Sequence, residues 1–379
     1  DEQLRELNRL REERDDALAL MRAGAIGMTA AIATAPRDEA SAAAQTPAPS
    51  PMRVSPSPAD ARAGSAGEAD APPAPQSVIV AAIPEGFGVL TPRGDLVLDP
   101  TFEFTRSSAN RLVFRGVEIV PGIQLGVIEA NDADRDSLVA SLGARYGLGE
   151  RLEVEARAPY VYRHDRVTTV VQRDETISRT MDIEGQDLGD IEFAARYQLN
   201  RGTGGWPVFV GQLRIKTPSG RGPFEVIYDE FGVAEDLATG SGFWSVEPGV
   251  TVLYASDPAV LFGGVSYLHS FARDIDKLLG GVPVGRVEPG DSIGLSMGFA
   301  FALNPRFSYS LGYAHNYIFA TKTELGDTVQ RSNSLQAGRL TMGLSLRLTE
   351  TITVSNNFEF GVTSDAPDMR WSLRVPIRF

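Results

Sequence analysis

The stretch RLEVEARAPYVYRH, residues 151–164, alternates between apolar and charged side chains. Because successive side chains of a β-strand point to opposite faces, a strand with this sequence has one apolar and one charged face. The apolar face consists of Leu152, Val154, Ala156, Ala158, Tyr160 and Tyr162, and the polar face of Arg151, Glu153, Glu155, Arg157 and Arg163. The pattern predicts a long strand that separates an oily environment from an aqueous one.

Similar segments recur from Gly94 to Phe379. They are longer than the roughly five or six residues that are usual in soluble strands. Tyr and Trp gather near the segment ends, and short turns alternate with long polar connections. These features favour an all-β fold, a transmembrane antiparallel β-barrel, over a water-soluble sandwich, because a lipid bilayer offers no water to unpaired strand edges and the sheet must close. A lipid bilayer, as the bacterial outer membrane, is therefore an expected partner.

The final segment, DMRWSLRVPIRF (368–379), also alternates and ends on an aromatic residue. Such an ending resembles the recognition signal of bacterial outer-membrane proteins, so Phe379 is predicted to be the barrel-assembly signal, with the barrel-assembly machinery as a partner. If Phe379 is periplasmic, the alternation of turns and loops predicts twelve strands. They are 94–107, 135–146, 151–163, 187–199, 206–216, 241–255, 258–271, 290–303, 306–319, 334–348, 351–361 and 368–379.

The piece RLVFRGVEIVPGIQLGVIEAN (111–131) allows a second count. Pro121-Gly122 at its centre predicts a tight turn. As an extracellular hairpin the piece leaves twelve strands, whereas two further spanning strands would make fourteen. Its arms are short for spanning, so we prefer twelve.

The N-terminal quarter has a different composition. Residues 1–35 begin with a charged helical stretch in which apolar residues recur at the spacing of a coiled-coil seam, although Arg14 occupies one seam position. It is either a solvated amphipathic helix or a self-association helix. Residues 36–76 are rich in Ala, Pro and Ser, and are predicted to be a disordered linker.

Residues 77–93, SVIVAAIPEGFGVLTPR, form an apolar segment between the linker and the first strand of the barrel, 94–379. Such a segment beside the barrel opening is predicted to enter it as a plug. The alternative is a short periplasmic segment packed under the rim. The candidate plug residues are Val78, Ile79, Val80, Ile83 and Phe87.

Composition excludes several functions. The formal net charge of −13 argues against nucleic acid as a partner, since nucleic-acid binding favours a basic surface. Cysteine is absent and the three histidines are far apart, so we expect neither a metal nor another cofactor. No catalytic arrangement is recognisable. Glu153 and Glu155 are interpreted as wall charges neutralised by Arg145, Arg151 and Arg157 rather than as an acid–base pair. The chain is therefore not expected to be an enzyme.

The polar faces of the strands predict a wet lumen that carries both signs of charge. The predicted pore-lining residues are Arg145, Glu153, Glu155, Arg157, Glu192, Arg196, Arg214, Lys216, Arg339, Arg347, Arg374 and Arg378. Twelve strands leave room for a pore unless something fills it. The long acidic loop 217–240 either folds inward as a constriction or remains solvated.

Two stretches carry a family resemblance. GVLTPRGDLVLDPTFEFTRSSANRLVFRGVEIVPG (88–122) followed by SLGARYGLGERLEVEARAPYVYR (141–163) resembles FapF-like secretion channels of functional-amyloid systems. LGDIEFAARYQL and KTPSG resemble, more loosely, outer-membrane barrels associated with phenol degradation. The similarity covers about 88–379, and the order of helix, linker, plug and barrel extends it to the N-terminus.

The resemblance to FapF-like channels implies homotrimers of twelve-stranded barrels that export unfolded amyloid subunits. It implies that 4–21 is a periplasmic trimerising helix and that 77–90 is the gating plug. The seam residue Arg14 and the short helix depart from that pattern, as an N-terminal truncation would explain. Two alternatives stay open: a passive diffusion channel for small hydrophobic or aromatic compounds, and a closed barrel that acts as a surface scaffold or adhesin.

Overall fold

The fold is taken from a computed structural model. It describes residues 90–115, 118–120, 123–124, 127–170, 178–202, 205–227, 236–256, 259–279 and 282–379. The predicted helix in 1–35, the linker 36–76 and the candidate plug residues Val78, Ile79, Val80, Ile83 and Phe87 lie outside this part of the chain.

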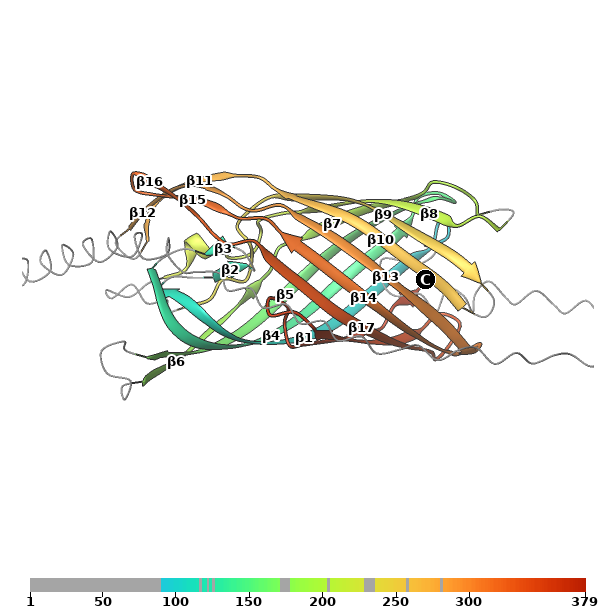
Figure 1. Cartoon of the computed structure of the whole chain (residues 1–379). Coiled ribbons are helices and arrows are strands. Elements are labelled where there is room, and N and C mark those ends of the chain that lie inside the picture. The colour runs from blue at the N-terminus through green and yellow to red at the C-terminus, as the bar shows by residue number, and fades with distance from the viewer. Residues whose placement is uncertain are drawn as a thin grey trace, which may run out of the picture. The chain divides into compact units, whose positions relative to one another are not determined.

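The described chain forms a closed antiparallel barrel (Figure 1). Its strands are β1 (Leu96–Arg115), β4 (Val127–Gly147), β5 (Leu152–Val170), β6 (Ser178–Leu188), β7 (Glu192–Gln198), β8 (Val208–Lys216), β9 (Ser245–Ser256), β10 (Ala259–Ser270), β13 (Ser292–Asn304), β14 (Phe307–Ile318), β17 (Leu335–Arg347), β18 (Thr353–Gly361), β19 (Met369–Arg374) and β20 (Ile377–Arg378). These 14 segments make twelve spanning strands, because β6 and β7 are consecutive pieces of one strand, as are β19 and β20.

Strand β1 closes the barrel. It pairs with β4 along its whole length and with β19 and β20 on its other edge. The main chains of Leu96 and Phe379 exchange two hydrogen bonds, of 3.3 and 2.8 Å. No edge of this sheet is left open to the bilayer, as a membrane requires.

The prediction of twelve strands is confirmed, and the count of fourteen is wrong. Residues 118–120 (β2, Glu118–Val120) and 123–124 (β3, Ile123–Gln124) pair with each other in a separate two-stranded sheet. The predicted strand ends were too short on this side, because β1 and β4 stay paired as far as Arg115 opposite Val127. Hairpin pairing therefore continues well past the residues that the apolar pattern marks.

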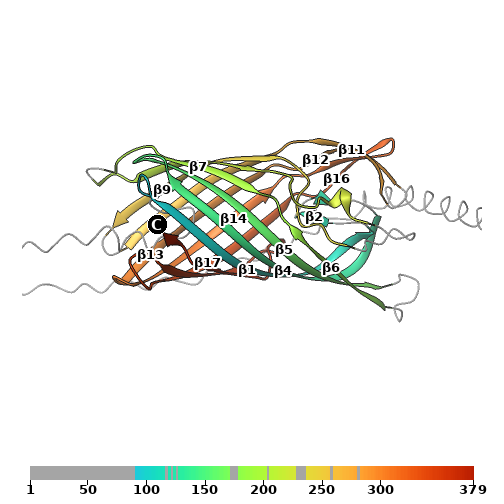
Figure 2. The same cartoon turned by 180° about the vertical axis from the view of Figure 1, so that it is seen from behind.

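A second, four-stranded sheet forms from the connections that follow β10 and β14. It consists of β11 (Arg273–Leu279), β12 (Val282–Glu288), β15 (Lys322–Leu325) and β16 (Thr328–Arg331). Both views place it at the end of the barrel opposite the C-terminus (Figures 1 and 2). Lys322 Nζ donates to Glu288 at 2.8 Å, and this hydrogen bond holds the pKa of Glu288 below its ordinary value.

The outer surface of the barrel is apolar. Large hydrophobic side chains at every second position are exposed, among them Leu142, Phe193, Met297 and Leu340. A belt of this extent is unfavourable in water and is satisfied by lipid. No helix in the described part of the chain is long and apolar enough to cross a membrane.

Candidate functional site

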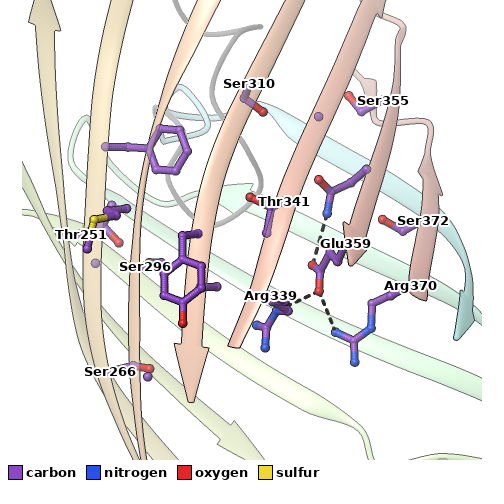
Figure 3. A pocket seen from close by; sticks show the side chains of 18 of the residues that line it. Thr251, Ser266, Ser296, Ser310, Arg339, Thr341, Ser355, Glu359, Arg370 and Ser372 are labelled. Carbon is purple, nitrogen blue, oxygen red and sulfur yellow. Dashed lines mark hydrogen bonds and ion pairs between the residues drawn. The ribbon is translucent and has the colours of Figure 1, made fainter. Parts of the chain in front are cut away.

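The barrel encloses a cavity of about 500 Å³, and a smaller one of about 190 Å³ shares part of its lining. Residues from many strands, including β1, β5, β8 and β19, line the larger cavity (Figure 3). Among the described residues, no group of three or more His, Cys, Asp or Glu side chains is arranged to hold a metal ion. The chemistry of this site is therefore that of a charged, hydroxyl-rich wall.

Seven of the twelve predicted pore-lining residues line one of the two inner cavities. Arg157, Arg214, Arg339 and Arg374 line the larger cavity, and Glu155, Arg157, Glu192, Arg196 and Arg214 line the smaller one. Arg145 contacts Asp99, Glu153 contacts Arg196, Lys216 contacts Asp190, and Arg378 lies 3.9 Å from Asp95. Arg347 lies eight residues after Arg339 on β17, and because this spacing is even the two share a face.

The two glutamates that resemble an acid–base pair are bound by one arginine. Arg196 Nη1 lies 2.7 Å from Glu153 Oε1 and 2.6 Å from Glu155 Oε2. The partner is on the neighbouring strand β7, whereas the sequence analysis proposed Arg145, Arg151 and Arg157. Cross-strand register, which places Glu153 opposite Arg196, decides this choice.

Several partners of the lining arginines were not recognised from the sequence. Glu359 on β18 binds Arg339 at 2.9 Å and Arg370 at 3.7 Å (Figure 3). Glu247 on β9 and Glu192 both contact Arg214. The alternation in NNFEF and SVEPG contains the signal for both carboxylates, because it places them on the inner face of their strands.

The lumen has one side without charges. The inner positions of β10, β13 and β14 that line the cavity are Phe262, Gly264, Ser266, Gly294, Ser296, Ser308, Ser310, Ala314 and Asn316, and none of them is charged. In Figure 3, Ser266, Ser296 and Ser310 lie on strands apart from the cluster of Arg339, Glu359 and Arg370. A chain or solute in the lumen therefore meets a neutral wall of mostly small side chains on one side and paired charges on the other.

A further part of the inner face is apolar. Leu253, Val260, Phe262 and Ala300 form a buried cluster, and Val208 packs against it. These positions lie near the connection between β9 and β10, at the end of the barrel that carries the short turns. This patch was not predicted from the sequence, because only polar residues were expected in the lumen and these strands are apolar on both faces here.

Thr91, which precedes β1, lies against the inner wall of the barrel. Thr91 is buried, and its main-chain N–H donates to Glu153 Oε2 at 2.7 Å while its hydroxyl donates to the same oxygen. Gly147 permits this approach, because a Cβ at that position would lie 2.0 Å from the Pro92 carbonyl oxygen. Residues 90–93, assigned to the plug segment, therefore lie on the lumen wall.

The described arms of the acidic loop, 217–227 and 236–242, fold inward. A Cβ on Gly185 would lie 2.6 Å from the Leu237 carbonyl oxygen, and Gly185 is opposite the inward-facing Arg163. The arms have a core of their own, in which Phe224 and Phe243 pack edge to face at 5.7 Å. These contacts favour the inward-folded alternative for the arms. The acidic residues at 229, 230 and 235 lie outside the described chain.

Asp190 joins the two arms. Its Oδ1 accepts the N–H of Gly220 at 3.1 Å, and its Oδ2 accepts the N–H and the hydroxyl of Ser241 at 2.8 and 2.6 Å. Lys216 Nζ lies 3.3 Å from the same carboxylate. The buried side chain of Asp190, two residues before β7, thus fixes the beginning and the end of the loop.

Replacing Asp190 with Ala is expected to free both arms. Each lost hydrogen bond to the charged carboxylate is worth about 1.5–3 kcal/mol. Hydrogen exchange at Gly220 and Ser241 should accelerate by about tenfold to a hundredfold, since about 1.4 kcal/mol corresponds to a factor of about ten. Asp190→Asn, which keeps the acceptor oxygen, should show a smaller change. Exchange that is unchanged in Asp190→Ala would contradict this role.

No family model matches the chain. Its structure is similar to that of the COG4313 outer membrane channel from Pseudomonas putida, with 16% sequence identity, a TM-score of 0.52, and coverage of 78% of this chain and 99% of that chain. It is also similar to the transport unit of the autotransporter AIDA-I from Escherichia coli (10% identity, TM-score 0.43, 76% of this chain and 90% of that chain). The NanC porin gives 10% identity, a TM-score of 0.39, and 74% and 98% coverage. The chain thus has the fold of an outer-membrane β-barrel channel.

Proposed function

We propose that the protein is a channel of the bacterial outer membrane, with its N-terminal segment in the periplasm and its twelve inward-facing charged residues along the conduction path. The closed barrel with an apolar exterior and an ion-paired, cavity-containing interior supports this proposal. Inward polarity of this density is compatible with water and not with a packed hydrophobic core.

The channel exports unfolded polypeptide and is gated by residues 77–90. The contact of Thr91 with Glu153 supports the proposed gate. It holds Thr91, the residue directly after the segment 77–90, on the lumen wall. A twelve-stranded barrel is roughly 24 Å across, given a strand spacing of about 4.8 Å and a tilt of about 40°. The thirteen residues from 78 to 90 span about 18 Å as a helix and roughly 40 Å when extended, so the apolar side chains reach well into the lumen.

The apolar side chains of residues 77–90 can pack against the apolar cluster around Phe262. Leu253, Val260 and Ala300 complete an inward-facing apolar surface in an otherwise polar lumen. Contact with Val78, Ile79, Val80, Ile83 or Phe87 would remove apolar area on both partners from water, worth about 25 cal/mol per Å². The neutral wall of β10, β13 and β14 then provides the path for an extended chain once the segment leaves.

The same cluster favours a second candidate function, a diffusion channel for small hydrophobic or aromatic compounds. In that case the patch formed by Leu253, Val260, Phe262 and Ala300 binds the solute rather than the segment. The neighbouring ion pairs are unfavourable for such a solute, which is why export is preferred.

An experiment on the barrel without residues 1–90 separates the two functions. An unfolded, glycine- and serine-rich polypeptide added to the periplasmic side should interrupt the single-channel current in planar bilayers. Phenol uptake into proteoliposomes should stay close to that of empty vesicles. Rapid phenol uptake without interruptions by the polypeptide would contradict export and support the diffusion channel.

Assembly follows the same proposal. Residues 4–21 join three barrels, and Phe379, whose side chain is 68% exposed, is read by the barrel-assembly machinery. The outward position of this ring at the seam between β1 and β20 supports such a role.

A further inference from the structure

Arg157 differs from the other arginines of the larger cavity, because it forms no ion pair with any described residue. Its Nε donates to the Ser141 hydroxyl at 3.2 Å, and its side chain lines both inner cavities. Arg214 and Arg339, by contrast, each bind a carboxylate. A guanidinium has five N–H donors, so Arg157 keeps most of its donor capacity for the cavity.

A buried hydroxyl lies beside this arginine. Thr101 is 8% exposed and lines the larger cavity, and its Oγ1 has no hydrogen-bond partner. In the register of the sheet, Thr101 is directly opposite Ser141 on β4 and Arg374 on β19. A buried polar group without a partner is costly, and this hydroxyl can donate its proton to a ligand that offers an acceptor oxygen.

The charges near Thr101 indicate that the acceptor group of the ligand is negative. Arg145 and Arg374 both contact the single carboxylate of Asp99, two residues before Thr101. Arg157 adds a third guanidinium to this part of the wall, and it contacts no carboxylate of the described residues.

Glu155 and Glu192, which line the smaller cavity together with Arg157, each bind another arginine. Glu155 binds Arg196 at 2.6 Å, and Glu192 binds Arg214 at 3.1 Å. The Arg157 guanidinium and the Thr101 hydroxyl therefore line the larger cavity without an anionic partner among the described residues, and Ser141, which accepts from Arg157 Nε, lies directly opposite Thr101.

We infer that Thr101, Ser141 and Arg157 form a binding site for a carboxylate in the lumen. Guanidinium and hydroxyl donors on three adjacent strands match the two oxygens of such a group, and charge-assisted bonds of this kind are short and strong. The carboxylate belongs either to a small solute or to an acidic side chain of a passing polypeptide. The site depends on the barrel wall alone and is present whatever the channel transports.

Saturation-transfer NMR on the full chain in detergent micelles tests the site, with succinate and tetraglutamate as separate probes. We expect at least one probe to bind saturably. Arg157→Gln should weaken that binding at least about tenfold and Thr101→Val several-fold, because each removes a hydrogen bond to a charged ligand. Binding of succinate alone assigns the site to small solutes, and binding of tetraglutamate assigns it to acidic side chains.

Two control variants distinguish the site from the general charge of the lumen. Arg370→Gln removes an arginine of the same cavity that is paired with Glu103 and Glu359, and Ser296→Ala removes a hydroxyl from the neutral wall. Both should bind within about twofold of the unaltered chain. Folding of each variant is checked by the heat-dependent shift in gel mobility. Absence of binding by both probes, or equal weakening in Arg370→Gln and Arg157→Gln, would overturn the inference.

Discussion

Deleting residues 1–90 is expected to raise the single-channel conductance several-fold in planar bilayers. The deletion removes the segment that the proposal places in the lumen, while the first strand and its pairing with β4, β19 and β20 remain intact. Conductance grows with the free cross-section of a pore, and the interior of a twelve-stranded barrel is wide once it is emptied.

A shorter deletion is the matched control for this experiment. Removing residues 1–76 takes away the helix and the linker but keeps 77–90 and the contact of Thr91 with Glu153. Its conductance should equal that of the full chain. Thr91→Val, which loses the hydroxyl bond, should open intermittently. If the two deletions and the full chain conduct alike, residues 77–90 do not occlude the lumen.

Replacing Arg196 with Met is expected to cost about 3–5 kcal/mol of barrel stability. The substitution leaves Glu153 and Glu155 without their shared partner, and the side chain of Glu153 is only 2% exposed. A buried carboxylate that has lost its cation pays a desolvation penalty with no compensating attraction. The effect should appear as a lower urea midpoint for unfolding in detergent.

Neutralising the whole cluster distinguishes this cause from lost packing. In the triple variant Glu153→Gln, Glu155→Gln and Arg196→Met no charge is left unpaired, and most of the stability should return. Such recovery is known for buried ion clusters that are replaced as a unit. A triple variant as unstable as Arg196→Met would show that the packing of Arg196, and not its charge, stabilises the wall.

The barrel itself could be predicted from the sequence because its determinants are local. A period of two in 151–164 and 334–348 fixes which side chains face lipid, and the lengths of the connections fix the direction of each strand. The inner positions of Arg214, Arg339 and Arg374 follow from that period alone.

The features that escaped prediction depend on contacts between strands far apart in the sequence. Glu153 selects Arg196 because of the register between β5 and β7, which no single segment reveals. The sheet of β11, β12, β15 and β16 joins two loops whose strands are too short to show a period. The inward cluster around Phe262 is hidden because β10 is apolar on both faces.

The pairing of β1 with β20 imposes an order on assembly. These partners stand at opposite ends of the sheet in sequence, so their hydrogen bonds form only after the intervening strands are in register. Thr91 lies just before β1 and contacts Glu153 on the inside of the wall. Because Glu153 lies on β5, two strands away from β1, this contact forms only once β1, β4 and β5 are in register, and it then fixes the residue before the first strand to the inner wall.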